Sequence, residues 1–118
     1  MKDIKEIEKE LRAYLERVGF KHYANKNNQI VEHIYVARFG LHGYDEDDCV
    51  VYIDFINVGN RYVYIDIVSI PTYSYINDIA IINKIPELRD FIEMCAKNKI
   101  KVTYNFKDVI ILEKDNGS

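Results

Sequence analysis

The amino-acid sequence predicts an α+β domain, in which a mostly antiparallel sheet of about five or six strands carries two helices on one face. Two segments, 3–18 and 86–98, repeat apolar residues at the three- and four-residue spacing of amphipathic helices. Between and after them, apolar residues alternate with others, as in half-buried strands. The chain of 118 residues contains no linker or repeat, so we expect a single domain over residues 1–118.

The first helix has sequence features typical of both helix ends. Asp3 can accept a hydrogen bond from the first turn, and Glu6 lies at the capping-box position three residues later. Gly19 suits the left-handed backbone that ends many helices, and Phe20 can fold back onto the last turn. The apolar stripe of this helix predicts that it covers the core, and consists of Ile4, Ile7, Leu11, Tyr14, Leu15 and Val18.

The stretch from Cys49 to Ile70 predicts a β-hairpin around Gly59 and Asn60. A three-residue loop, Val58-Gly59-Asn60, separates apolar from polar side chains better than a two-residue turn does, and we prefer it for that reason. Asn60 would then take the left-handed position, and Asp54 and Asp66 would lie diagonally across one face. The predicted core face holds Cys49, Val51, Ile53, Phe55, Val63, Ile65 and Ile67. The opposite face holds Val50, Tyr52, Asp54, Ile56, Tyr62, Tyr64, Asp66 and Val68.

Further strands are predicted on both sides of this hairpin. A short strand after Phe20 and a longer one over Ile30–Phe39 flank a polar NKNN turn, and the weak alternation of the longer strand leaves its buried face open. Pro86 suits the first turn of the second helix, whose stripe is Leu88, Phe91, Ile92 and Cys95. Strands at 100–104 and 109–112, separated by a turn near residues 106–108, complete the domain.

Charge is distributed unevenly along the chain. The net charge is -3, but residues 41–80 hold seven acidic side chains against Arg61 alone, together with six of the ten tyrosines. Such a surface repels phosphate backbones, so we expect no direct contact with nucleic acid. The charged N-terminus and the absence of a long apolar run predict a cytoplasmic protein that does not contact membranes. We expect Cys49 and Cys95 to be buried free thiols.

Few residues suggest catalysis or a cofactor. His22, His33 and His42 lack the spacing of a helical ligand pair, and we expect no metal or other cofactor. The acidic run 45–48 lacks the glycine and glutamate that a calcium-binding EF-hand loop needs. Asp54 and Asp66 could bridge a metal ion in a hydrolase, but they lack a third acid and a nearby lysine. We therefore expect a non-enzymatic protein.

The remaining hypothesis is a protein-binding surface, because tyrosine is enriched in interface cores and carboxylates favour a basic partner. Residue usage typical of AT-rich genes suggests a bacterial, phage or mobile-element origin. The expected partner is then a nucleic-acid-handling protein. This chain would be its inhibitor, of the anti-CRISPR or anti-restriction kind. The alternatives are a homodimer that covers its own tyrosine face, a single-stranded nucleic-acid binder and a metal-dependent hydrolase. The candidate binding residues are Tyr44, Asp45, Glu46, Asp47, Asp48, Tyr52, Asp54, Tyr62, Tyr64 and Asp66.

Overall fold

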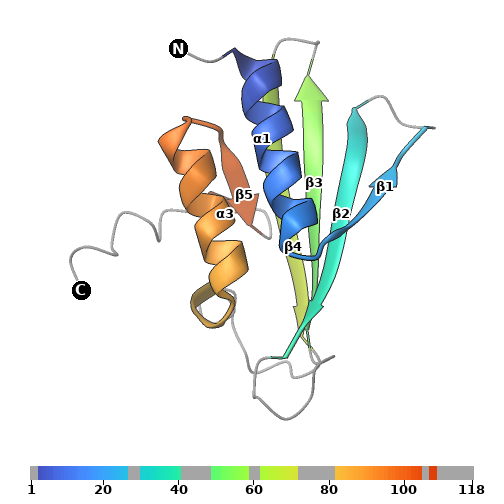
Figure 1. The fold of residues 1–118 in the computed structure, drawn as a ribbon, viewed down its shortest axis with the longest axis vertical. Helices are drawn as coiled ribbons and strands as arrows, with labels where there is room; N and C mark the ends of the chain where they lie inside the picture. The colour runs from blue at the N-terminus through green and yellow to red at the C-terminus, as the bar shows by residue number, and fades with distance from the viewer. Residues whose placement is uncertain are drawn as a thin grey trace.

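The computed structural model describes residues 3–26, 30–40, 49–58, 62–71, 82–104 and 107–108. These residues form two layers, a six-stranded sheet and a layer of helices that covers one of its faces (Figure 1). The helical layer consists of α1 (Ile4–Arg17) and α3 (Pro86–Lys97), which lie side by side in front of the sheet in that view. The predicted α+β class is confirmed.

The strands follow one another across the sheet in chain order, β1-β2-β3-β4-β5-β6. Neighbouring strands are antiparallel except β4 and β5, which run parallel, with Ile65 opposite Val102. A parallel pair needs a crossover connection, and α3 lies within the segment that makes it. The strands are β1 (Lys21–Ala24), β2 (Val31–Phe39), β3 (Cys49–Val58), β4 (Tyr62–Pro71), β5 (Val102–Tyr104) and β6 (Lys107–Asp108).

Helix α1 begins and ends as its sequence predicts. The Glu6 amide donates to Asp3 Oδ1 at 2.9 Å, and the Asp3 amide donates to Glu6 Oε1 at 3.3 Å, which completes the capping box. At the other end Gly19 has a φ of 105°, and the Phe20 amide donates to the Leu15 carbonyl at 2.9 Å. This bond is the closing bond of a Schellman motif, and it fixes the direction in which the chain enters β1.

Helix α3 ends with the same motif, although the sequence offers no glycine there. Lys99 has a φ of 60°, and the Ile100 amide donates to the Cys95 carbonyl at 2.8 Å. Pro86 begins the helix, as predicted. The predicted apolar stripe, which includes Cys95, is fully buried against the rest of the core.

The hydrophobic core lies between the helices and one face of the sheet, which we call the inner face. The predicted faces of the hairpin are confirmed for the described side chains, with Ile56 as an exception because only 9% of it is exposed. Both cysteines are free thiols in the core. The sequence did not determine which face of β2 is buried. In the structure Tyr35 is 0% exposed and points inward, so its face of β2 is the buried one. The inner face of the hairpin is formed by Cys49, Val51, Ile53, Phe55, Val63, Ile65 and Ile67.

The predicted hairpin loop is wrong by one residue. Val58 belongs to β3 and pairs with Tyr62, so it is not part of the loop and the predicted loop Val58-Gly59-Asn60 is displaced by one residue. Asp54 therefore lies directly opposite Asp66, and the predicted diagonal arrangement is also wrong. The change moves each residue's partner by two positions, and since side chains alternate with a period of two, every side chain keeps its face. The predicted left-handed Asn60 lies outside the described residues.

The strand predicted at 100–104 begins later, at Val102, and the last strand begins earlier than predicted. Lys107 and Asp108, expected in a turn, pair with Tyr104 and Thr103 as the short strand β6, while the predicted strand 109–112 lies outside the described residues.

None of the described helices is long and apolar enough to cross a membrane.

Candidate functional site

The sheet face that points away from the helices is the first candidate site, and we call it the outer face. Its exposed side chains include Tyr23, Tyr52 and Ile70, with 46%, 37% and 54% of their surface accessible. Both helices described in the structure lie on the opposite side of the sheet (Figure 1). Lys21 and Arg38 lie at the margin of the outer face, on β1 and near the end of β2. Its central residues are Val50, Tyr52, Asp54, Ile56, Tyr64, Asp66, Val68, Ile70 and Thr103.

Two carboxylates occupy the centre of this face. Asp54 on β3 and Asp66 on β4 are direct cross-strand partners, an arrangement that is unfavourable for like charges. Burial, and then the charge of Asp66, raise the pKa of Asp54 above its ordinary value. The hydroxyl of Thr103 on β5 donates to Asp66 Oδ1 at 2.7 Å, which orients that carboxylate. The pair thus concentrates negative charge on a half-buried, otherwise apolar surface.

The structure brings together four of the predicted binding residues. Tyr52, Asp54, Tyr64 and Asp66 share the outer face, because they lie at alternating positions of two paired strands. The backbone of Tyr62 belongs to the same face by alternation, but its side chain lies outside the described part of the chain. The other predicted residues, Tyr44, Asp45, Glu46, Asp47 and Asp48, also lie outside it.

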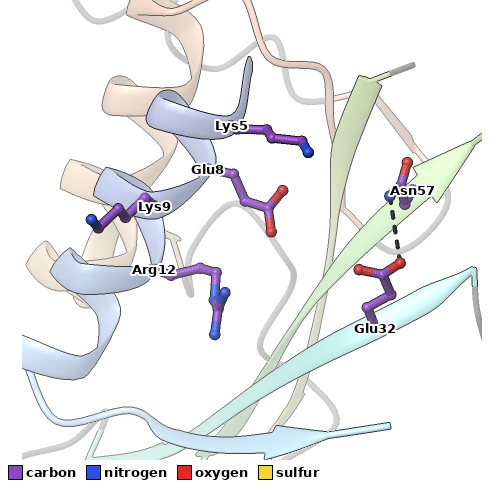
Figure 2. A pocket seen from close by; sticks show the side chains of 6 residues that line it. All are labelled: Lys5, Glu8, Lys9, Arg12, Glu32 and Asn57. Atoms are coloured by element: carbon purple, nitrogen blue, oxygen red, sulfur yellow. Dashed lines mark hydrogen bonds between the residues drawn. The ribbon is translucent and has the colours of Figure 1, made fainter. Parts of the chain in front are cut away.

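A charged groove between α1 and the β2–β3 side of the sheet is the second candidate site, and sequence reasoning missed it. Figure 2 shows Glu8 of α1 pointing into the groove and Glu32 of β2 facing it across the gap. Asn57 donates to Glu32 Oε2 at 3.5 Å. The groove has a volume of about 620 Å³ and is lined by Lys5, Glu8, Lys9, Arg12, Glu32 and Asn57. Three of these side chains are basic and two are acidic, so the groove carries only a small net positive charge.

The buried ring of Tyr35 connects this groove to the core. Arg12 Nε donates to the Tyr35 hydroxyl at 2.9 Å, and that hydroxyl donates to Glu16 Oε2 at 3.0 Å. Burial raises the pKa of Tyr35, and it also raises the pKa of Glu8, although the charge of Arg12 opposes the latter effect. These bonds hold α1 against β2 and fix the side of the helix that faces the groove.

Two histidines that are distant in sequence meet beside this network. His22 on β1 and His33 on β2 are diagonal neighbours on the inner face, and His22 Nε2 lies 2.9 Å from His33 Nδ1. The ring of His22 also stacks on Tyr35, with 4.8 Å between centroids. On the other side of its ring, His33 Nε2 lies 4.0 Å from Glu8 Oε2. Burial first, and then the charge of Arg12, lower the pKa of His33.

The histidine pair could have been found only by aligning β1 with β2. The two residues are separated by the turn that contains NKNN, and their contact depends on the register of the strands that this turn connects. Two histidines on neighbouring strands do not show the three- or four-residue spacing of a helical ligand pair. Within the described ranges, no group of three or more His, Cys, Asp or Glu side chains could hold a metal ion.

Comparison of the chain with protein-family models, curated proteins and solved structures finds no match. The function must therefore be argued from the two sites themselves.

Proposed function

We propose that this chain is a non-enzymatic, cytoplasmic protein-binding module whose outer face docks onto a basic surface of a partner protein. The observation that carries the proposal is the directly opposed pair Asp54 and Asp66 at the centre of an exposed, tyrosine-bearing sheet face. The partner class that fits best is a nucleic-acid-handling protein, because such proteins present dense Lys and Arg patches. Binding there would inhibit the partner by competing with nucleic acid.

The apolar part of the outer face supports a protein interface. Tyr52 and Ile70 are exposed, and Tyr64 lies half-buried between them and the hairpin end. Tyrosine offers a large amphipathic contact area and loses little conformational entropy when it is fixed. Tyr52 and Ile70 lie on the paired strands β3 and β4, and exposed apolar side chains gathered on one face are typical of interaction sites.

The two carboxylates determine which partner chemistry the face favours. A Lys or Arg side chain placed between Asp54 and Asp66 would relieve their repulsion and form charge-assisted hydrogen bonds with both. A nucleic-acid phosphate at the same place would meet two like charges. The centre of the face therefore favours a cationic group on a protein over a nucleic-acid backbone.

The same charges weigh against a homodimer formed through this face. In a two-fold symmetric dimer whose axis passes through the centre of this face, the Asp54–Asp66 pairs of the two copies would approach each other. Like charges juxtaposed at an interface cost several kcal/mol. A heterologous basic partner is therefore the better occupant.

The proposal is tested by affinity capture from the source cell with matched baits. We expect the wild-type chain and the variant Asp90→Asn to retain the same basic protein, because Asp90 is an exposed residue on α3, away from the outer face. The double variant Asp54→Asn/Asp66→Asn should lose it, and capture by the wild type should weaken as salt rises. The captured protein is then purified, and its binding to the three baits is measured by calorimetry.

Two results would contradict the proposal. One is equal affinity of the purified partner for the wild type and for the double variant, which would remove the carboxylates from the interface. The other is a wild-type chain that sediments as a dimer while the variant Tyr52→Ala sediments as a monomer. That result would assign the outer face to a second copy of this chain.

A further inference from the structure

We propose that His22 and His33 form a binding site for a divalent transition-metal ion of tetragonal preference, Cu²⁺ or Ni²⁺, at the β1–β2 edge of the sheet. This site is separate from the outer face, because both rings lie on the inner face. It does not depend on the proposed protein-binding function. Neutral imidazole is a common ligand for both ions.

The separation of the two ring nitrogens fits this class of ion. His22 Nε2 and His33 Nδ1 are 2.9 Å apart. Two nitrogens bound at roughly 2.0–2.1 Å are roughly 2.9 Å apart when the angle at the metal is 90°, and roughly 3.3 Å apart at the tetrahedral angle. In the metal-free fold this separation is that of a hydrogen bond between the rings, so both nitrogens can reach one ion. Cu²⁺ and Ni²⁺ are assigned because both ions prefer nitrogen and oxygen ligands in tetragonal geometry.

A neighbouring carboxylate favours the tautomer of His33 that the site needs. Glu8 Oε2 lies 4.0 Å from Nε2 of His33, close enough to attract a proton on that nitrogen and so to leave Nδ1 free as a ligand. Stacking on Tyr35 limits the rotation of the His22 ring. To bind one ion, each ring must turn so that its lone pair points at the ion. The two bonds to the ion then replace the hydrogen bond between the rings.

The position of the pair leaves room for further ligands. β1 is an edge strand of the sheet, and Glu8 and Arg12 of α1 face the pair from the helical layer. The side chains of His22 and His33 are partly exposed, and 21% of His33 is accessible. Water molecules can therefore complete the coordination sphere around two protein ligands. A bound ion would also link β1, a four-residue edge strand, to β2.

The test titrates the purified full chain with Cu²⁺ and with Ni²⁺, followed by calorimetry and, for Cu²⁺, by electron paramagnetic resonance. The variants His22→Gln and His33→Gln each remove one ligand and should weaken Cu²⁺ binding by about tenfold or more. The matched control is His42→Gln, which alters the third histidine of the chain and should bind like the wild type. The double variant His22→Gln/His33→Gln measures binding to the rest of the chain.

The spectrum provides a readout that a merely structural role of the histidines would not change. The wild-type Cu²⁺ complex should show coupling to two imidazole nitrogens, and each single variant to one. Melting temperatures without metal show whether each variant is folded. Equal Cu²⁺ and Ni²⁺ affinities of the wild type and the double variant would overturn the proposal, as would a loss of binding in His42→Gln. Tighter binding of Zn²⁺ than of Cu²⁺ would contradict the tetragonal assignment.

Discussion

The ionised carboxylate of Asp54 lowers the stability of the fold. Burial and the facing charge of Asp66 raise its pKa, so the folded chain binds a proton at this carboxyl more tightly than the unfolded chain does. The free energy of unfolding therefore falls as the pH rises from the ordinary pKa of Asp to the raised value in the fold. A half-buried residue that lowers stability, at a position where Asn or Thr could stand, suggests a role other than folding.

The first prediction follows from that sign. Asp54→Asn should raise the free energy of unfolding by a few tenths to about 1 kcal/mol at about pH 7, because it removes a partly buried charge and the cross-strand repulsion with Asp66. The difference should shrink as the pH falls through the ordinary pKa of Asp and vanish below about pH 3, where the wild-type carboxyl is protonated in both states. Thermal unfolding of both proteins across this pH range measures the effect. A variant that is less stable than the wild type at neutral pH would mean that the Asp54 carboxylate contributes a favourable interaction to the fold.

At the scale of elements, both helices end in the same backbone conformation with different residues. Gly19 adopts the left-handed conformation after α1 with no atom close to the position of an added Cβ, so any cost of substitution there is conformational. Lys99 adopts that conformation after α3 with a Cβ already present. A non-glycine residue in the left-handed region costs roughly 1–2 kcal/mol.

The second prediction concerns this difference. Lys99→Gly should raise the free energy of unfolding by about 0.5–1 kcal/mol, since relief of the strain exceeds the entropy that glycine adds to the unfolded chain. The matched substitution Gly19→Ala should lower it by about 1 kcal/mol. Urea unfolding of the three proteins gives both values. If Lys99→Gly were destabilising, the Lys99 side chain would have to contribute a favourable contact.

At the scale of the whole molecule, one sheet separates a buried side from an open one. Ile53 and Tyr52 are consecutive in β3, yet Ile53 is 0% exposed under the helices and Tyr52 is 37% exposed on the outer face. An identical change at these two positions therefore tests the two-layer architecture directly.

The third prediction is that Ile53→Asp unfolds the domain, whereas Tyr52→Asp leaves it folded. A carboxylate in the core costs several kcal/mol, which is comparable to the total stability of a small domain. Circular dichroism and melting curves distinguish the two variants. Equal loss of structure in both would show that the outer face is covered as well, either by the chain itself or by a second copy.

Local patterns in the sequence determined much of this protein. The capping box at Asp3, the glycine end of α1 and the stripe of α3 each depend on contacts within a few residues, and each was predicted. Alternation along β3 and β4 also determined which side chains share a face, so Tyr52, Asp54, Tyr64 and Asp66 were grouped correctly. Their grouping remained correct despite the wrong loop, because a shift of the pairing by two residues does not change the face.

Only the tertiary structure decided the contacts that depend on strand register and on connections between distant segments. The direct opposition of Asp54 and Asp66 required the true register, which alternation cannot distinguish from a register shifted by two residues. The contact between His22 and His33 depended on the pairing of β1 with β2, and the parallel pairing of β4 with β5 depended on the path around α3. Periodic patterns report the direction of a side chain relative to its own strand or helix, whereas these contacts arise from how separate elements are placed in space.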